Sequence, residues 1–564
     1  MMEEANRLHT PGSRRELFAV LVLAILIIAV WAPRRTGPLD LRWDGGVYYI
    51  LGTSLAEGKG YRLLNEPGEI EANQYPPLLP LIVAVHQWLA GTSDFVVVGT
   101  WMRGTYFLIY TAFIFTAYAV LRRYLPGSWP LLAAIVVVVH PQTNFLSDLC
   151  FAELPFALAT TLFVLLSGPP AGPLRRVGAG ACAAAAYLLR TIGIALLAAW
   201  VVEALLGRRF RTAALRAVLA LLPIVGWYAH VARVERSAEY EHPAYAYQRA
   251  DYLFYNVSYA RNLLLDDPFK PSGRTASTLD LAYRWWGNLA HVPKGLGTAV
   301  TAKAESWERV KEIPTLGPLI PWKVVLYLPA VIGIIVLSGL GILLAGHARL
   351  IGLYVVFTVA AICLTPWSWR GQWERYLAPA TPFLAVAFAR GVMTLSTASR
   401  RLPTWAQRAS HASQLGLVIV VLAVELLTMA RIYTLYRYPA TLSDRGGHVV
   451  TQKLFFYDES HQAIATALKW VMSRARPGDV VAASMPHWVY LLTGLKSVMP
   501  PLVSDVGLVQ TLLDSVPVRF VVIDDTWPPI ARDYTLPLLA SAPERWERVY
   551  SDAVRDVAIY ERRP

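Results

Sequence analysis

Charged residues are scarce in this chain. Only 16% of its 564 residues are Asp, Glu, Lys or Arg, against about a quarter in an average soluble protein. Hydrophobic residues make up 55%, which excludes a disordered protein, a fibrous repeat and an ordinary cytosolic enzyme. The long apolar runs instead indicate a polytopic α-helical membrane protein.

Cysteines and metal-ligand patterns are few. Cys150, Cys182 and Cys363 lie in or beside apolar runs and form no CxxC pair, so neither a disulfide framework nor a thiolate metal site is indicated. The eleven histidines show no HxxxH or HExxH spacing, which gives a metal site little support. The sequence has no Gly-rich phosphate loop, which argues against a nucleotide-driven pump. It requires no cofactor and leaves dependence on a divalent metal open.

Positive charge exceeds negative charge, with 52 Lys and Arg against 39 Asp and Glu and a formal net charge of +13. Many arginines stand in pairs between apolar runs, as in the cytoplasmic loops of membrane proteins. The excess therefore indicates topology rather than a nucleic-acid partner. The run Leu17–Ala32 could be a signal peptide, but its poor cleavage site favours an uncleaved first span.

About eleven membrane spans are expected, the shorter ones extending into their neighbours. Segment 78–89 is left out because it is short, follows Tyr75 and two prolines, and contains Pro80. These features favour a helix that lies at the membrane surface or re-enters it. The predicted spans are 17–33, 97–121, 129–141, 150–167, 177–189, 191–206, 212–231, 323–345, 349–365, 376–392 and 412–432.

The arginines orient these spans. The predicted cytoplasmic loops hold eleven arginines and the short outer connections hold three, so the positive-inside rule places the N-terminus inside and the C-terminus outside. Residues 1–432 then form the membrane domain. The predicted extracytoplasmic segments are the first loop 34–96, a short turn at 142–149, a long loop at 232–322 and the tail 433–564.

The tail has the pattern of a small α/β domain. Residues 461–476 read as a helix, and a Pro-Gly-Asp turn separates them from an apolar strand at 480–484. Residues 520–523 form a second apolar strand, and 554–560 alternate with a period of two. We therefore expect a periplasmic α/β domain at 433–564.

Asp44 is the first candidate for chemistry. It precedes two glycines and a helix-like run, 47–57, in the first outer loop. Asp is favoured at helix N-caps, so one interpretation is structural. A carboxylate at the membrane boundary could also deprotonate an acceptor hydroxyl. The two roles are compatible.

Glu153 lies just inside the outer end of a predicted span, with no cation nearby in sequence. A carboxylate there is costly unless it is paired, so it is either functional or reaches interfacial water. Arg190, between two short spans, could pair with Glu153 or bind a phosphate. Asp148 is expected to cap a helix, and Glu425 is expected to pair within the helix bundle.

Arg370 and Arg375 lie beside Trp and Tyr residues at the outer end of another span. A guanidinium offers bidentate, permanently charged donors to phosphate, so these arginines could hold a phosphate at headgroup depth. The alternative is an aromatic belt with arginines that reach toward the headgroups.

Together these stretches resemble the C-type superfamily of integral-membrane glycosyltransferases. The protein O-mannosyltransferase and aminoarabinose-transferase families and their bacterial relatives look most similar. The resemblance covers nearly the whole chain in order, and the tail around 489–494 is similar to the periplasmic domain of some relatives. The motifs that carry it are Asp44 with Tyr48, Tyr49, 56–61 and Tyr75–Pro80, then 147–156 with Glu153, then Arg375–Pro379.

The resemblance implies a glycosyltransferase of the bacterial inner membrane whose active site faces the periplasm. It would move a monosaccharide from a polyprenyl-phosphate donor to a periplasmic glycan, lipid or protein, with inversion at the anomeric carbon. Asp44 would be the base and Glu153 a second acid. Arg190, Arg375 and Arg370 are expected at the donor phosphate, and Tyr48, Tyr49, Tyr75 and Tyr376 at the substrate.

One departure limits the resemblance. Aminoarabinose transferases carry an acid–Lys pair before the proline of the first-loop motif, whereas this chain has Gln74 and Tyr75. The metal and lysine–phosphate contacts of that family therefore do not carry over, and the aminoarabinose substrate is in doubt.

Three other functions compete. A transporter or lipid flippase would more often show internal repeats and midplane charges, whereas the distinctive charges here cluster at one face. A noncatalytic scaffold for envelope assembly predicts that Asp44 is replaceable. A ligase or polymerase that uses lipid-diphosphate glycans is the nearest enzymatic alternative.

Overall fold

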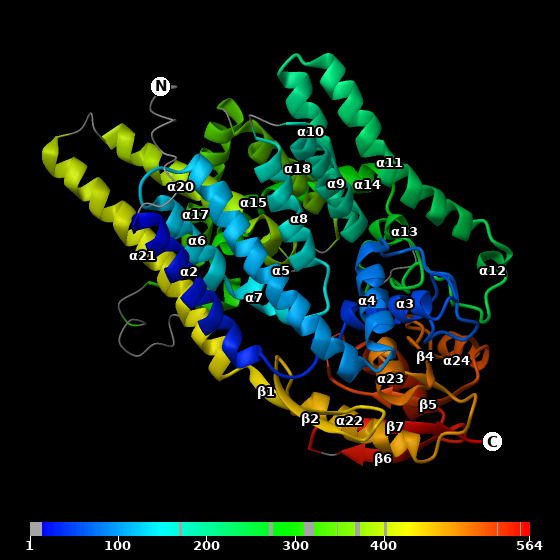
Figure 1. Cartoon of the computed structure of the whole chain (residues 1–564). Coiled ribbons are helices and arrows are strands. Elements are labelled where there is room, and N and C mark those ends of the chain that lie inside the picture. Colours follow the sequence, from blue (N-terminus) through cyan, green and yellow to red (C-terminus); the bar gives the residue numbers. More distant parts are fainter. Residues whose placement is uncertain are drawn as a thin grey trace.

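The computed structural model describes residues 14–168, 172–269, 275–308, 318, 321–346, 348–366, 373–399, 403–526, 528–552 and 554–564. A large helical part holds most of the chain, and a smaller α/β domain at the C-terminal end packs against one end of it (Figure 1). Arg370 lies outside the described residues.

Each of the eleven predicted apolar segments is helical. Among the described residues, six helical segments are long and apolar enough to cross a membrane: α2, α5, α11, α17, Trp373–Leu395 (which includes most of α20) and α21. The span count of eleven and the orientation stay predictions. The helices are α2 (Arg14–Trp31), α5 (Phe95–Tyr124), α6 (Trp129–Val139), α8 (Glu153–Leu166), α9 (Pro173–Leu189), α10 (Ile194–Leu206), α11 (Phe210–Glu235), α17 (Trp322–Ala345), α18 (Arg349–Leu364), α20 (Thr381–Ser399) and α21 (Thr404–Thr434).

The predicted turn at 142–149 is wrong, because these residues form helix α7 (Pro141–Asp148). Pro141 occupies the first helical position, and the His140 side chain caps the helix by accepting the Thr143 N–H at 3.2 Å. Helix α7 bends by 47° from α6, and the pair would count as a seventh span if it crosses as one unit.

The end of α7 is tied to the first loop by a buried ion pair. Asp148 is not a helix cap as predicted; its carboxylate accepts from Arg103 of α5 at 2.5 Å. Arg103 also donates to the carbonyls of Gly37 at 2.7 Å and Pro38 at 2.5 Å. A buried charge requires such pairing, so Arg103 fixes the chain that leads into α3.

The first loop contains two packed helices, α3 (Asp44–Ala56) and α4 (Leu78–Ala90). They approach closely at Gly52, where a Cβ would lie 2.6 Å from the Val83 side chain. Helix α4 exposes Val85, Trp88 and other apolar side chains on its outer side. Exposed apolar side chains of this kind are expected where a helix contacts lipid.

The long loop at 232–322 is largely structured, with α12 (Ala238–Glu241), α13 (Tyr259–Leu263), α14 (Thr278–Leu289), α15 (Val292–Val300) and α16 (Ala304–Glu308). Helix α15 lies against α17, with Leu296 fully buried. Gly297 and Gly333 permit this contact, because a Cβ on either would overlap a backbone carbonyl of the other helix.

The C-terminal α/β domain contains the predicted helix and strands, but the last predicted strand begins at Val557 rather than at 554. Its five-stranded sheet has the order β4-β3-β5-β7-β6, with β3 parallel to β4 and β5, and β7 antiparallel to β5 and β6. The strands are β3 (Val480–Ala482), β4 (Lys496–Val498), β5 (Val518–Ile523), β6 (Trp546–Asp552) and β7 (Val557–Arg562).

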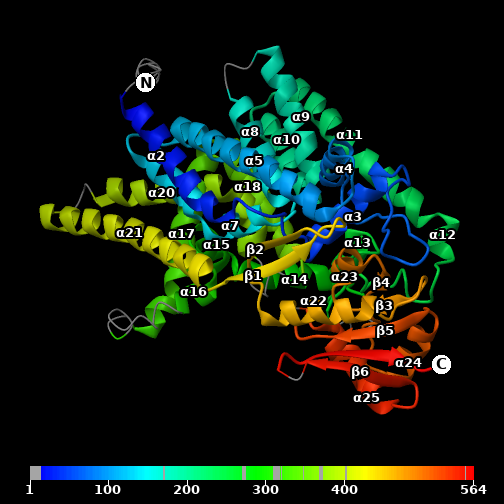
Figure 2. The same ribbon diagram turned by 60° about the horizontal axis from the view of Figure 1, so that its bottom comes forward.

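Helices cover both faces of this sheet (Figure 2). Helix α22 (Glu459–Met472) buries its apolar side chains on one face, whereas α24 (Val506–Asp514), α25 (Leu536–Ser541) and part of the long loop pack on the other. A hairpin of β1 (Arg437–Ser443) and β2 (Val449–Phe455) connects α21 to the domain, and α23 (Pro486–Thr493) reaches back to α3.

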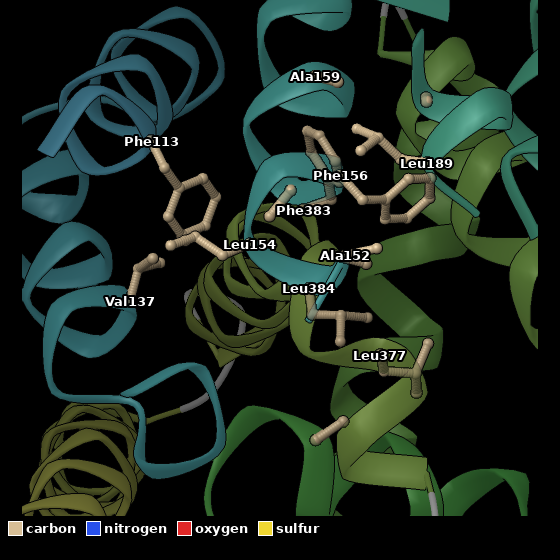
Figure 3. Packing of buried hydrophobic residues seen from close by; sticks show 14 of the residues in the cluster. Phe113, Val137, Ala152, Leu154, Phe156, Ala159, Leu189, Leu377, Phe383 and Leu384 are labelled. Atoms are coloured by element: carbon tan, nitrogen blue, oxygen red, sulfur yellow. The ribbon is translucent and has the colours of Figure 1, made fainter. Parts of the chain in front are cut away.

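The hydrophobic core of the helical part supports the start of α8. Leu154 and Phe156 of α8 lie among Phe113 of α5, Val137 of α6 and Phe383 of α20 (Figure 3). All five side chains are buried, and dense packing of this kind restricts movement of the backbone. The residue just before them, Glu153, is therefore held in a fixed position.

Candidate active site

A cavity of about 380 Å³ lies where the start of α3, helix α7, the long loop and the segment before α20 meet. Its lining is largely aromatic and includes Trp43, Tyr75, Tyr255 and Tyr376, together with a small number of charged side chains. Ligand sites in proteins commonly combine an apolar wall with a small number of placed polar groups. The described ionisable residues that line it are Asp44, Tyr75, Arg190, Tyr255, Tyr259, Lys303, Arg375 and Tyr376.

A network of two carboxylates and two guanidinium groups forms one wall. Arg375 of α19 (Trp373–Leu377) donates from Nε to Glu153 Oε1 at 3.0 Å and from Nη2 to Asp44 Oδ2. Arg190 forms an ion pair with the same Glu153 oxygen. Residues from four distant segments thus meet at one point, and their formal charges cancel.

Asp44 does not cap α3, so the structural interpretation of this residue is wrong. The helix begins at Asp44 itself, Trp43 occupies the N-cap, and no side chain caps the helix. Trp43 has a φ of 54°, a strained conformation of the kind that is concentrated at functional sites. The Asp44 carboxylate is therefore available to Arg375 and the cavity.

Neighbouring contacts hold the start of α3 in place. Arg42 pairs with Asp40 at 2.6 Å and donates to the carbonyl of Phe455 at 2.6 Å, which ties the segment to β2. A Cβ at Gly46 would lie 2.9 Å from the Leu41 carbonyl and 3.1 Å from His487 Cβ. Only glycine fits there without a shift.

Glu153 lies behind the two arginines and is absent from the described lining of the cavity. Its side chain is 3% exposed, and it is the first residue of α8, where the helix dipole favours a negative charge. Arg190 pairs with Glu153 and also lines the cavity. The pairing that the sequence left open therefore exists and still leaves Arg190 facing the site.

The predicted tyrosines divide between two places. Tyr75 and Tyr376 line the cavity, and Tyr48 packs behind Tyr75 with ring centroids 4.7 Å apart. Tyr49 is placed elsewhere: its hydroxyl donates to the Ser93 carbonyl at 3.0 Å, and the residue lines a separate cavity beside the β1–β2 hairpin.

The sequence analysis did not single out the long-loop residues of this site. Tyr255 donates to Asp44 Oδ1 at 3.5 Å, and Tyr259 and Asn262 also line the cavity. Burial, reinforced by the Asp44 carboxylate, raises the pKa of Tyr255, so its hydroxyl stays neutral and can donate. A usable signal was the density of tyrosines, because six fall within residues 240–259.

The C-terminal domain reaches the same site through His487 of α23. The His487 ring meets Tyr255 edge-on, with centroids 4.6 Å apart. Burial lowers the pKa of His487 to about 3, so the imidazole is neutral at physiological pH. The domain thus contributes a packing contact behind Tyr255.

A second cavity of about 460 Å³ adjoins the first. It lies beside α7, α15 and the outer end of α21, and most of its lining is apolar. The two cavities share the side chains of Gln142, Phe145, Lys303 and Phe456. Lys303 therefore lies at their boundary.

Metal ligands are not grouped in the part of the chain that the structure describes. No three His, Cys, Asp or Glu side chains there could hold one metal ion.

Comparison with solved structures identifies the fold, whereas no protein family and no curated protein matches the sequence. ArnT from Cupriavidus metallidurans bound to undecaprenyl phosphate aligns over 96% of this chain and 97% of that one, with a TM-score of 0.52 and 12% identity. The Archaeoglobus fulgidus oligosaccharyltransferase, in complex with Zn and sulfate, aligns over 96% of this chain and 73% of that one, with a TM-score of 0.53 and 11% identity.

The chain therefore shares its overall fold with ArnT and with the archaeal oligosaccharyltransferase. This likeness confirms, at the level of the fold, the resemblance predicted from the sequence.

Proposed function

We propose that this protein transfers one monosaccharide from a polyprenyl-phosphate donor to an acceptor on the extracytoplasmic side of the membrane. The observation that carries the proposal is the convergence of Asp44, Glu153, Arg190 and Arg375 beside an aromatic cavity in a C-type fold. The complex of the similarly folded ArnT with undecaprenyl phosphate supports a lipid phosphate as the carrier.

The charges of the site suit a monophosphate-linked donor. The two carboxylates and two guanidinium groups cancel, and Lys303 adds one positive charge to the lining. A phosphodiester between polyprenol and a sugar carries one negative charge, which this balance matches. A lipid diphosphate would bring a second negative charge without a further described cation in the lining.

Arg375 couples donor binding to activation of the base. Its guanidinium is shared between Asp44 and Glu153. A donor phosphate competes for the same donors, because a guanidinium binds phosphate in a bidentate manner. When Arg375 turns to the phosphate, Asp44 loses its ion pair and can accept a proton.

Transfer then proceeds by a single displacement. The acceptor hydroxyl attacks the anomeric carbon while Asp44 takes its proton, and the bond from the anomeric carbon to the phosphate oxygen breaks. The departing phosphate gains a second negative charge, which Arg190 and Arg375 stabilise. Asp44 is the one carboxylate in the described lining, and Glu153 holds the arginines from behind. The described lining holds no second carboxylate that could form a covalent intermediate, so inversion is expected.

The remaining expected residues have supporting roles. Tyr75 and Tyr376 are proposed to contact the substrate directly, and Tyr48 supports Tyr75 from behind. Arg370 stays a candidate for the donor phosphate. A periplasmic glycan, lipid or protein would serve as acceptor for a multi-pass enzyme of the bacterial inner membrane. A structure of the archaeal oligosaccharyltransferase, which has a similar fold, is tethered to an acceptor peptide, and this supports an acceptor of such a kind.

The proposal can be tested with purified protein in liposomes. Mannosyl, glucosyl and pentosyl polyprenyl phosphates would be compared with the matching diphosphates, in the presence of an envelope extract as acceptor source. Release of free polyprenyl phosphate, measured by mass spectrometry, is expected from a monophosphate donor. Turnover of diphosphate donors alone would favour the ligase or polymerase function. Flipping of a lipid without cleavage would favour a transporter.

A further inference from the structure

Two carboxamide side chains face each other in the wall of the cavity. Gln74 of the first loop donates from Nε2 to Asn262 Oδ1 of α13 at 3.0 Å, and Asn262 Nδ2 donates to the Asp251 carbonyl at 3.1 Å. Both residues line the cavity and both are buried; Gln74 is 4% exposed. The long loop and the first loop are thus joined at the site by an amide pair.

The carbonyl oxygen of Gln74 is left without a hydrogen-bond partner among the described residues. An unpaired buried acceptor is costly, and in a native protein it commonly marks a place where a ligand or water completes the bonding. Gln74 lines a cavity that also holds the hydroxyls of Tyr75 and Tyr259. A ligand hydroxyl could donate to the Gln74 oxygen from within this cavity.

The charges around this acceptor disfavour a cationic ligand. Arg190, Lys303 and Arg375 line the cavity, whereas Asp44 is the one carboxylate in the described lining and is paired with Arg375. An ammonium group would meet these three like charges and would compete for Asp44, which is the proposed base. A neutral hydroxyl group meets the amide pair without this penalty.

We propose that Gln74 and Asn262 form the subsite that reads the sugar of the donor, and that they select a neutral, hydroxyl-bearing sugar over an amino sugar. The assignment rests on the proposed transferase function and adds the class of sugar to it. The Gln74 carbonyl accepts a sugar hydroxyl, while Asn262 fixes the Gln74 amide by accepting a hydrogen bond from its Nε2.

Donor competition in liposomes tests the subsite. Two polyprenyl phosphates would be compared, one with a neutral pentose or hexose and one with a 4-amino pentose, by the kcat/KM of polyprenyl phosphate release. Wild type is expected to prefer the neutral sugar about tenfold or more. Gln74→Glu supplies a carboxylate for an ammonium, so it is expected to shift the preference toward the amino sugar. Equal use of both donors by wild type, or an unchanged preference in folded Gln74→Glu, would overturn the inference.

A matched control distinguishes loss of the subsite from a general loss of buried hydrogen bonding. Gln87 is also buried, also donates from Nε2, here to Thr53 at 2.8 Å, and also has an unpartnered carbonyl oxygen among the described residues, but it does not line the cavity. Gln74→Met is expected to raise the KM for the neutral donor about tenfold, whereas Gln87→Met leaves the donor preference unchanged. A change of preference in Gln87→Met would contradict a role specific to the cavity.

Binding measured without turnover distinguishes the two proposals. The shift in thermal unfolding caused by each donor would be recorded for wild type and Gln74→Met. Stabilisation of wild type by the neutral donor, reduced in Gln74→Met, supports the subsite even if no transfer occurs and the transferase proposal fails. Absence of stabilisation by either donor would overturn the subsite as well.

Discussion

Replacing Arg375 with lysine tests whether the Arg375 guanidinium moves from the proposed base, Asp44, to the donor phosphate. Arg375 reaches Glu153 at 3.0 Å through Nε and Asp44 through Nη2, while its guanidinium carbon lies 4.8 Å from the centre of the Phe151 ring. A lysine keeps the charge but has a single ammonium group, so it cannot bridge both carboxylates or bind phosphate in a bidentate manner.

We expect Arg375→Lys to lower the catalytic rate strongly and the folding stability only slightly. Loss of one preorganised donor to a developing anion costs about 2.7–4 kcal/mol in the transition state, or about 10²–10³ in kcat. The positive charge remains and the side chain is partly exposed, so the folding cost should stay well below the ~3–5 kcal/mol of a broken buried pair. We expect a kcat reduced about a hundredfold in a folded protein, with a small rise in KM.

The assay is polyprenyl phosphate release by wild type and Arg375→Lys in liposomes. Arg216→Lys is the matched control, because Arg216 also pairs with a carboxylate, Glu203 at 2.7 Å, but does not line the cavity. The reasoning is refuted if folded Arg375→Lys keeps kcat within about threefold of wild type, or if Arg216→Lys loses as much.

Three further predictions concern topology and stability. A reporter fused after Arg123 should lie in the cytoplasm and one fused after Leu89 outside it; the same side for both would contradict the surface assignment of α4. Glu425→Gln should raise the unfolding temperature, because the Glu425 carboxylate is fully buried without a hydrogen-bond partner among the described residues; an unchanged or lower temperature would contradict this. Burial raises the pKa of Asp524 to about 6 from an ordinary 3.8, so its protonated form is favoured on folding. Unfolding of the C-terminal domain, followed by tryptophan fluorescence, should therefore show stability that is full below about pH 4 and has fallen by about 3 kcal/mol once the pH has risen through 6. Asp524→Asn should flatten that fall, and an equally steep profile would refute it.

The helices of the membrane part could be predicted because apolar runs report them directly. Each predicted apolar segment is helical, and the helix at 461–476 and strand at 520–523 in the tail correspond to α22 and β5. The turn at 142–149 was wrong because the polar sequence resembles a loop, while its His140 cap and Pro141 start form a helix. The capping contact of His140 therefore mattered more for this segment than its polar composition did.

Pairing between distant residues could not be predicted in the same way. Glu425 was expected to pair within the bundle, yet both its oxygens lack a partner among the described residues. Asp148 was expected to cap a helix and instead pairs with Arg103. A single sequence records that a charge is costly in its segment, but not which neighbour the fold places beside it.

In the candidate site, too, some residues could be predicted from the sequence but their pairing could not. Asp44, Glu153 and Arg375 stood out as charges at the outer ends of apolar segments, but the pairing of Asp44 with a residue 331 positions away depends on how the helices pack. Gln74 entered the sequence analysis only as a departure from a family motif and Asn262 did not enter it, and their shared position in the cavity is what joins them. Uncharged residues that line a site are harder to recognise from a sequence than charges within apolar segments.

The turnover of Asp44→Asn tests the central claim most directly. Asn has nearly the same shape and cannot accept the proton of the acceptor, and Asp44 is not a helix cap whose loss would unfold α3. In liposomes with donor and acceptor, we expect release of polyprenyl phosphate to fall about 10²–10⁴-fold, with unchanged expression and unfolding temperature. Glu203→Gln, which changes a carboxylate that does not line the cavity, should keep full activity. Turnover by folded Asp44→Asn within about threefold of wild type would contradict Asp44 as the base.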